Sequence, residues 1–388
     1  MVDIRGDVDD GFGGVADAFG ANFENYGEAG AAFCLHVSGR RVVDIWAGVA
    51  DTTTGRPWER DTLCLHFSTT KGVAAICAAM LYERGQLDYE APVADYWPEF
   101  AQAGKEAVTV AQCMSHTAGL AAVDADVTLD EILAVDPVVD AIARQAPLWE
   151  PGTANGYHGL TYGWIVGEIV RRIDGRRIGQ FLREEVAEPF AIDTFIGLPE
   201  SEEGRVARLQ AAPPPTDPVM VEMMMKVLGP GTLGYRMLTM NGAMPPTAAE
   251  GEEMLFNTRG MHATEMPGAN GISTARALSQ LYAACVSEVD GHRLIGDDTV
   301  KHIRAARSKG PDKCLVIEAS WGLGFMRDMP FSPMLGSESF GHAGAGGSLA
   351  YGDLEAQVGY GYVMNQMGGG ISGDPRTIAL NDAVRACL

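Results

Sequence analysis

Residues 67–81 read FSTTKGVAAICAAML, in which a short, mostly polar segment precedes an almost continuous apolar run. An apolar run of this length predicts a buried helix over about residues 69–84. Gly85 follows at the position where glycine commonly ends a helix. The polar segment, which contains Ser68 and Lys71, should therefore form the first turn of this buried helix.

Ser68 and Lys71 have the residue types and the spacing that nucleophilic catalysis requires. Residues i and i+3 share one face of a helix, so the Lys71 amine can reach the Ser68 hydroxyl. The helix N-terminus also favours the negative charge that develops on the serine oxygen. This is the only S-x-x-K in the chain, and the G-x-S-x-G signature of a nucleophile elbow is absent. The alternative interpretation is a lysine exposed at the start of a helix.

A serine–lysine pair usually needs a second acid–base group, and Tyr157 is the conspicuous candidate. It lies in Gly156-Tyr157-His158-Gly159, between a turn and a helix predicted over residues 160–173. A tyrosine between glycines at such a junction is placed to reach a cleft. Most tyrosines are packing residues, which is the alternative here.

A glycine-dense run, FGHAGAGGS at residues 340–348, is the third element. Glycines let backbone N–H groups approach a ligand closely, so this run could supply an oxyanion donor. It has neither the ending nor the helix context of a phosphate-binding loop. His342 within the run is as consistent with a structural role as with a functional one.

The sequence predicts strands near both ends of the chain and mainly helices between them. Two apolar runs, residues 32–37 and 41–48, flank a Ser-Gly turn and predict an antiparallel hairpin. Residues 348–351 and 358–363 predict strands near the other end, and a helix is expected over 375–387. The two ends could therefore combine into one sheet.

This order of strands, helices and strands predicts an α/β (α+β) fold. In this fold an antiparallel sheet is flanked by helices, and a helical domain is inserted into it. We expect residues 1–88 and 267–388 to form the sheet domain and residues 89–266 a mainly helical domain. Ten methionines crowd into residues 219–266. They are either flexible core filling or a lid or adaptable acyl pocket, since thioethers repack around varied apolar shapes.

Composition excludes several classes of function. The 388 residues are 46% hydrophobic and 21% charged, as in soluble globular proteins. The net charge of −22 disfavours nucleic acid and anionic membranes as partners. Seven scattered cysteines without a C-x-x-C pair indicate free thiols, and no signal-peptide or membrane-anchor pattern is present. Histidine spacing supports no metal site. We therefore expect a cytoplasmic protein without metal or cofactor.

In this order and spacing, the three motifs resemble serine hydrolases of the class C β-lactamase fold, in the penicillin-binding-protein-like superfamily. They are most similar to the family VIII carboxylesterases. Four further segments fit that superfamily: residues 88–93, 115–120, 154–157 and 321–325. The resemblance covers the chain from about residue 20 to the end, apart from the methionine-rich region.

The resemblance implies a role for each motif residue. Ser68 matches the acylated nucleophile, Lys71 the residue that accepts or relays its proton, and Tyr157 the tyrosine of the Y-x-N motif. Residues 342–344 match the third motif, K-T-G in β-lactamases and often H-x-G in the esterases. An oxyanion hole from the N–H groups of Ser68 and Ala345 is implied as well. Further substrate contacts are expected at His342, Gly344, Gly346, His158 and Asn270.

Two departures from the family pattern bear on the substrate. Gly159 replaces the Y-x-N asparagine, which contacts the acylamino group of the drug in β-lactamases. His342 replaces the K-T-G lysine, and histidine is largely neutral at pH 7. Both changes weaken recognition of an anionic amide and leave acyl transfer intact. For Asn270, capping of the helix expected near Ile272 is the alternative to lining the cleft.

The expected function is hydrolysis of short-chain or neutral carboxylic esters through a Ser68 acyl-enzyme, with a small-molecule ester as the partner. Alternatives on the same fold are β-lactam hydrolysis, cleavage of D-amino-acid peptides or amides, and acyl transfer to an alcohol. A non-catalytic penicillin-recognising protein is a further alternative, because a fold by itself does not imply activity.

Overall fold

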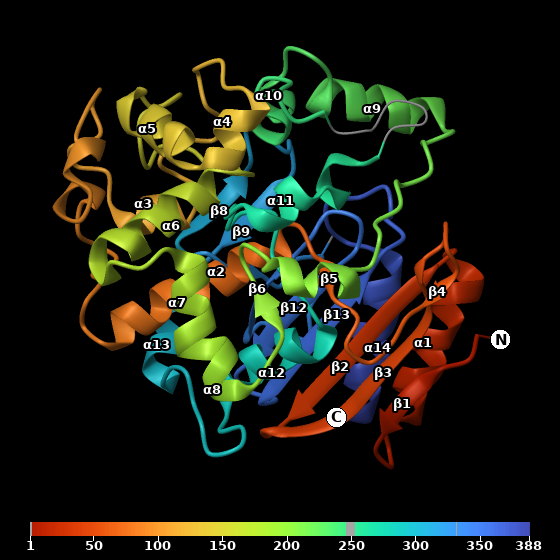
Figure 1. The fold of residues 1–388 in the computed structure, drawn as a ribbon. Coiled ribbons are helices and arrows are strands. Elements are labelled where there is room, and N and C mark those ends of the chain that lie inside the picture. Colours follow the sequence, from red (N-terminus) through yellow and green to blue (C-terminus); the bar gives the residue numbers. More distant parts are fainter. Residues whose placement is uncertain (1, 246–252, 331) are drawn as a thin grey trace.

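The computed structural model describes residues 2–245, 253–330 and 332–388. Within them, the centre of the molecule is a ten-stranded antiparallel sheet (Figure 1). Its strands follow one another in the order β1 (Arg5–Val8), β3 (Arg40–Asp51), β2 (Gly30–Val37), β13 (Val358–Met364), β12 (Leu349–Asp353), β11 (Ser339–Ala343), β10 (Met326–Arg327), β9 (Glu318–Trp321) and β8 (Ser308–Pro311). The remaining strand, β4 (Arg56–Pro57), pairs with β3. The pairing of β2 with β13 joins the two ends of the chain into one sheet.

A small second sheet lies beside the start of the helix that carries Ser68. It contains β5 (Cys64–Leu65), β7 (Ile272–Ser273) and β6 (Thr194–Phe195). The helices are α1 (Gly13–Asn25), α2 (Thr69–Glu83), α3 (Val110–Met114), α4 (Leu129–Ala134), α5 (Asp136–Arg144), α6 (Thr161–Asp174), α7 (Ile178–Leu182), α8 (Glu188–Phe190), α9 (Pro218–Leu228), α10 (Leu233–Thr239), α11 (Arg259–Ala263), α12 (Ala275–Val286), α13 (Asp297–Arg304) and α14 (Pro375–Cys387).

The sequence of β13 explains how helices cover both faces of the large sheet. Successive residues of a strand point to opposite faces. Tyr360 and Tyr362 lie in the apolar core beneath α1 and α14, which pack against each other. Gly359 and Gly361 face α12, where an added Cβ would lie 2.2 and 2.3 Å from backbone carbonyl oxygens of that helix. The glycines therefore let α12 lie directly on the sheet, and α2 packs against β11 and β12 on the same side.

The predicted architecture is confirmed. The hairpin is β2 and β3, the C-terminal strands are β12 and β13, and the buried helix is α2, of which all residues from Thr69 to Leu81 are buried. Residues 89–266 contribute one short strand, β6, and otherwise helices and loops among the described residues. The division of the chain into two domains stays a prediction. No helix in the described residues is long and apolar enough to cross a bilayer.

Candidate active site

Ser68 directly precedes α2, on a backbone that turns sharply just before it. Phe67 has a φ of +43°, which residues other than glycine rarely adopt. Its ring packs edge-on against Phe256, with centroids 4.9 Å apart, and this contact helps to hold the turn. Ser68 occupies the N-cap position of α2, yet its side chain makes no capping hydrogen bond. The hydroxyl is therefore available to the side chains that face it.

Lys71 is fully buried and directs its amine at Ser68. Nζ donates to Ser68 Oγ at 3.0 Å and to the carbonyl oxygens of Gly159 and Gly268 at 2.6 and 2.7 Å. Burial lowers the pKa of Lys71 well below its usual range. The neutral amine can accept a proton from Ser68, and the two carbonyls can stabilise the ammonium that results.

Tyr157 approaches Ser68 from the other side. Its OH donates to Ser68 Oγ at 2.9 Å, and Lys71 Nζ lies 4.8 Å from the centre of the phenol ring. The side chain is only 6% exposed. Burial raises the pKa of Tyr157 above its usual range, and the hydrogen bond with Ser68 offsets this only in part. The phenol therefore stays protonated and can serve as a proton donor.

Two elements hold Tyr157 in this position. Its ring stacks on the indole of Trp321, with centroids 5.4 Å apart and an interplanar angle of 14°. The loop that carries Asp312 also contacts the tyrosine segment, because the Lys313 N–H donates to the Asn155 carbonyl at 2.9 Å. Asp312 Oδ1 accepts from the Leu315 N–H at 2.9 Å and thereby holds the shape of this loop.

The turn between β11 and β12 leaves the amide of Ala345 free. Gly344 N–H donates to the Ser348 carbonyl at 2.8 Å, Gly346 N–H to the Gly370 carbonyl at 3.0 Å, and Gly347 N–H to the Gly344 carbonyl at 3.1 Å. In the part of the chain that the structure describes, no hydrogen bond uses the backbone N–H of Ala345 or that of Ser68. Both amides can therefore donate to an oxygen atom bound next to Ser68.

His342 lies on β11 close to the reacting groups and is buried. Its Nδ1 lies 2.6 Å from the Ala343 carbonyl oxygen and therefore donates to it. Burial, together with the nearby Lys71 amine, lowers the pKa of His342 to about 3. The position that holds a lysine in K-T-G is therefore occupied here by a neutral ring.

A small apolar cavity of about 50 Å³ adjoins Ser68. On this scale a cavity that holds one water measures roughly 10–15 Å³, so this one has room for only a few non-hydrogen atoms. Its walls come from six separate segments of the chain. The lining residues are Ser68, Tyr157, Leu238, Leu315, Ile317, Ala319, Trp321, Met326, Met329, His342, Ala345, Ile371 and Ser372.

The structure brings Ser68, Lys71, Tyr157, His342 and Ala345 together. Gly344 and Gly346 shape the turn that carries Ala345 but do not line the cavity. At Gly344 an added Cβ would lie 2.2 Å from both the His66 carbonyl oxygen and Ser348 Oγ, so no side chain fits there.

The expectations for His158 and Asn270 need correction. His158 is fully buried: Nδ1 lies 2.7 Å from the Gly156 carbonyl oxygen and Nε2 accepts from the Leu120 N–H at 3.0 Å. Neighbouring side chains in an extended segment point in opposite directions, so His158 points away from Ser68 when Tyr157 points toward it. Asn270 is also buried, and its amide bonds three backbone groups. It thereby fixes the loop whose Gly268 carbonyl holds Lys71.

The alternative for Asn270, a helix cap, is wrong as well. The N-cap of α12 is Thr274, whose hydroxyl accepts from the Ala277 N–H at 3.1 Å. Sequence reasoning also missed Trp321 and the loop that carries Asp312 as supports of Tyr157. Trp321 stands in the family-like segment 321–325, which was the available signal, whereas no sequence signal marked Asp312.

The methionine-rich region is divided between surface and core. Met220, Met223, Met224 and Met225 on α9 are exposed, whereas Met237, Met240, Met244, Met261 and Met266 are buried. Leu238 on α10 reaches the cavity. This region therefore contributes to the pocket wall through α10. Among residues 2–245, 253–330 and 332–388, no group of three His, Cys, Asp or Glu side chains could hold a metal ion.

Comparison with known proteins agrees with this geometry. The model of the Beta-lactamase family matches residues 15–384. The chain belongs to the beta-lactamase family. It is 33% identical to Esterase/beta-lactamase LipL of Mycobacterium tuberculosis (strain ATCC 25618 / H37Rv) over 377 residues, 94% of this chain and 83% of LipL.

Two solved structures of beta-lactamase-like proteins superpose over the full length of both chains. A family VIII carboxylesterase does so with a TM-score of 0.89 at 37% identity. A penicillin-binding protein homolog from Caulobacter crescentus does so with a TM-score of 0.86 at 40% identity. The resemblance drawn from the motifs is thus confirmed, and the chain is a hydrolase related to the β-lactamases.

Within the beta-lactamase family, the departure at Gly159 now has a structural reason. A Cβ at residue 159 would lie 1.9 Å from Met237 Sδ. The buried Met237 of α10 therefore fills the space that a side chain at this position would need. Gly159 keeps one function at the site, because its carbonyl oxygen accepts from Lys71.

Proposed function

We propose that this protein is a serine esterase that cleaves short-chain, uncharged carboxylic esters through an acyl-enzyme on Ser68. The observation that carries the proposal is the surroundings of Ser68 Oγ, which lies 3.0 Å from Lys71 Nζ and 2.9 Å from Tyr157 OH beside a small apolar cavity. The likeness to a family VIII carboxylesterase and to LipL supports the same assignment.

Acylation begins when Ser68 Oγ attacks the ester carbonyl carbon and its proton passes to Lys71. The carbonyl oxygen becomes an oxyanion, which accepts hydrogen bonds from the N–H groups of Ser68 and Ala345. The bond to the alcohol oxygen then breaks, and the leaving alkoxide takes a proton from Tyr157, which regains one from Lys71. Water attacks the acyl-enzyme by the reverse proton route and releases the acid and free Ser68.

The pKa directions divide the roles between Lys71 and Tyr157. Burial lowers the pKa of Lys71 and raises that of Tyr157. Burial therefore leaves the amine unprotonated and able to accept a proton, and it keeps the phenol protonated and able to donate one. This assignment makes Lys71 the base toward Ser68 and Tyr157 the acid toward the leaving group, with no phenolate needed in the resting enzyme.

The cavity supports an uncharged substrate with a short acyl chain. Its volume of about 50 Å³ leaves little room beyond a short alkyl group. None of its lining residues is lysine or arginine, and His342 is kept neutral because burial lowers its pKa to about 3. The pocket thus offers no fixed cation for the carboxylate of a β-lactam, and the net charge of −22 disfavours anions generally.

The test compares hydrolysis of p-nitrophenyl butyrate by the wild type, by Ser68→Ala and by Ser273→Ala. Ser273 is a matched control because its buried hydroxyl also lies within hydrogen-bond distance of a side-chain nitrogen, His66 Nε2 at 2.9 Å. Loss of activity in Ser68→Ala alone supports the proposal. Retention of activity in Ser68→Ala contradicts it, and faster turnover of nitrocefin than of the ester would assign β-lactam hydrolysis instead.

We also propose a cytoplasmic location. All seven cysteines are free, and six of them are buried. Free thiols persist in a reducing compartment, whereas exported proteins commonly form disulfides. Fractionation of the native host, with the protein followed by antibody, tests this proposal. Recovery in the periplasmic or secreted fraction would contradict it.

A further inference from the structure

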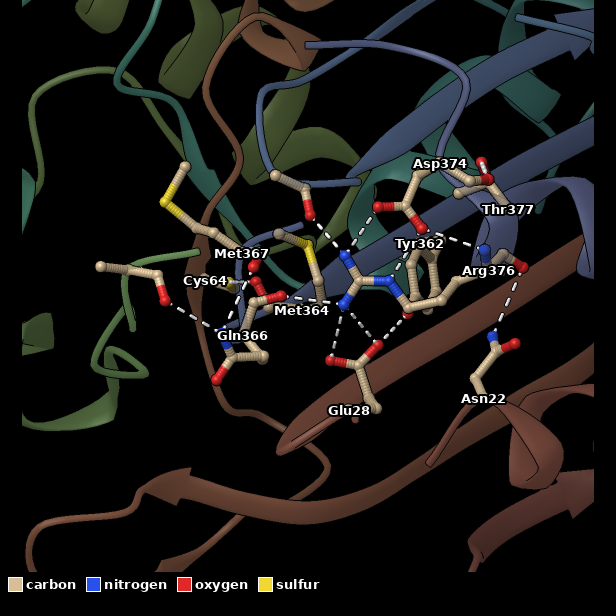
Figure 2. Close-up of polar contacts among 12 residues, drawn as sticks. Asn22, Glu28, Cys64, Tyr362, Met364, Gln366, Met367, Asp374, Arg376 and Thr377 are labelled. Atoms are coloured by element: carbon tan, nitrogen blue, oxygen red, sulfur yellow. Dashed lines mark hydrogen bonds and ion pairs between the residues drawn. The ribbon is translucent and has the colours of Figure 1, made fainter. Parts of the chain in front are cut away.

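A buried arginine lies directly behind the turn that carries Ala345. Arg376, in the first turn of α14, is 2% exposed (Figure 2). Its Nε and Nη2 donate to the two oxygens of Asp374, each at 2.8 Å. Its Nη1 donates to the buried carboxylate of Glu28, with both oxygens at 3.1 Å. The guanidinium is thus held between two carboxylates.

The two remaining N–H groups of Arg376 bind backbone carbonyls. Nη1 donates to the Gln366 carbonyl at 2.8 Å, and Nη2 donates to the Gly346 carbonyl at 2.5 Å. All five donors of the guanidinium are therefore used. Three of them bind carboxylates, one binds the loop after β13, and one binds the turn between β11 and β12.

The turn fits this cluster too closely for any side chain. An added Cβ on Gly347 would lie 2.5 Å from Arg376 Nη2 and 2.7 Å from Asp374 Oδ2. Gly347 also has a φ of +123°, a conformation that L-residues with side chains rarely adopt. The glycine-dense sequence is thus required by the arginine behind it as well as by the cavity in front of it.

Two peptide planes connect the guanidinium to the free amide of Ala345. The first contains the Gly346 carbonyl, which accepts from Arg376, and the Gly347 N–H. That N–H donates at 3.1 Å to the Gly344 carbonyl. The Gly344 carbonyl shares the second plane with the Ala345 N–H. Because peptide groups are rigid, the direction of the first plane sets the direction of the second.

We propose that Arg376 is a positioning residue for the oxyanion hole, which fixes the direction of the Ala345 N–H through the Gly346–Gly347 peptide. The proposal rests on the proposed function, since it needs Ala345 to be an oxyanion donor. Arginine suits this role because its planar fork can bind two carboxylates and a carbonyl at once. A lysine at residue 376 has a single nitrogen and cannot span Glu28, Asp374 and Gly346.

The expected signature is a loss of turnover with little loss of substrate binding. Removing one oxyanion-hole donor costs roughly 10²–10³-fold in kcat, and a misdirected donor should cost less. We expect Arg376→Lys to lower kcat by about 10- to 100-fold and to change KM by less than about threefold. KM should change little because the Ala345 N–H stabilises the oxyanion of the transition state more than it stabilises the bound ester.

The experiment measures kcat and KM with p-nitrophenyl butyrate and the inhibition constant of butylboronic acid. The boronic acid forms a tetrahedral adduct with the serine oxygen, and one of its oxygens occupies the oxyanion site. The control is Arg276→Lys, since Arg276 forms a comparable ion pair with Asp44 at 2.8 Å at the start of α12. A merely structural role would not make boronate affinity and kcat fall by the same factor.

A second variant serves if Arg376→Lys does not fold. Asp374→Asn keeps the side-chain oxygen that caps α14 by accepting from the Arg376 N–H at 2.9 Å, and it presents an amide to the guanidinium. Parallel losses of kcat and boronate affinity in the folded variant, with Arg276→Lys unaffected, support the proposal. A folded variant with kcat within about twofold of wild type, or with unchanged boronate affinity, overturns it. Activity in Ser68→Ala would instead overturn the proposed function.

Discussion

The ring of Tyr157 lies nearly parallel to the indole of Trp321, with centroids 5.4 Å apart and planes 14° apart. The ring of His116 contacts the same tyrosine at 5.0 Å and meets Trp321 edge-on at 4.4 Å. These rings restrict the phenol to one orientation, in which its OH points at Ser68 Oγ. Trp321 thus contributes to the site through Tyr157 as well as by lining the cavity.

Truncation of Trp321 should therefore reduce turnover. We expect Trp321→Ala to lower kcat by about 10- to 100-fold, since small misplacements of a reacting group can cost this much. Trp321→Phe retains an aromatic face for stacking, so its kcat should lie between that of the wild type and that of Trp321→Ala. The measurement is kcat with p-nitrophenyl butyrate, with thermal unfolding as the control for folding. Wild-type turnover in a folded Trp321→Ala would show that the stacking does not position Tyr157.

Tyr157→Phe tests the proton transfer alone. This change removes one oxygen and keeps the ring that packs on Trp321, so the fold should be preserved. We expect turnover to fall by roughly 10²-fold or more, the usual contribution of a general acid–base group. Steady-state kinetics measures the loss, and mass spectrometry of the protein after rapid mixing shows whether acylation has slowed. Unchanged turnover would refute the role assigned to Tyr157.

The pH dependence of kcat/KM should reveal the titration of Lys71. Because burial lowers its pKa well below the usual value, we expect activity to rise with pH as the amine loses its proton, at a pH below 10.5. Burial lowers the pKa of His342 to about 3 and that of His158 to about 4, so neither should titrate near neutrality. Lys71→Arg, which stays charged, should be inactive. A kcat/KM that falls as the pH rises from 6 to 9 would contradict a basic role for Lys71.

The sequence was sufficient for the parts of the site that depend on local geometry. Ser68 and Lys71 are three residues apart on one helix turn, so their contact follows from helical periodicity. Tyr157 and Ala345 lie far away along the chain, and only the family pattern connected them to Ser68. The fold could be predicted for a similar reason, because the apolar residues of the strands and helices at the two ends of the chain recur at regular intervals.

The remaining features depend on tertiary contacts that leave no periodic signal. Leu238, Ile317 and Ile371 line the cavity from separate segments, yet each resembles any other core residue in the sequence. Arg376 and Glu28 are separated by almost the whole chain, and their pairing exists only once β2 and β13 have paired. His158 follows Tyr157 directly in the sequence, yet its ring does not line the cavity and bonds backbone groups of Gly156 and Leu120 instead.

Enlarging the cavity should change the preferred acyl chain. Leu238 lines it from α10 and is partly buried, so Leu238→Ala removes pocket wall without opening the main core. We expect the ratio of kcat/KM for p-nitrophenyl octanoate to that for the butyrate to rise by about tenfold, since a few methylene contacts are each worth roughly 0.8 kcal/mol. Leu233→Ala on the same helix is the control, because Leu233 does not line the cavity. If the ratio of kcat/KM for the two esters does not change, the acyl chain does not bind in this cavity.

Glu28 should make stability depend on pH near neutrality. Burial raises the pKa of its carboxyl from 4.5 to about 7, against the opposing effects of Arg376 and the Tyr362 hydroxyl, and Asp374 adds to the rise. Cys64, whose own pKa is raised by burial and then by Glu28, is the other neighbouring titratable group. Burial is thus the main reason why protonation of Glu28 is favoured, and the second carboxylate on the same guanidinium, Asp374, is a smaller one. Between pH 4.5 and 7 the folded protein thus binds more protons at this carboxyl than the unfolded chain does.

The contribution of Glu28 to stability is therefore present in full below pH 4.5 and is lost as the pH rises through about 7. Glu28→Gln cannot titrate and keeps the shape of the side chain. We expect the wild type to lose up to roughly 3 kcal/mol relative to Glu28→Gln between pH 5 and pH 8. Urea unfolding of both proteins at these two pH values measures the difference. A wild-type protein that gains stability relative to Glu28→Gln over this range would show that Glu28 is ionised in the fold at pH 5.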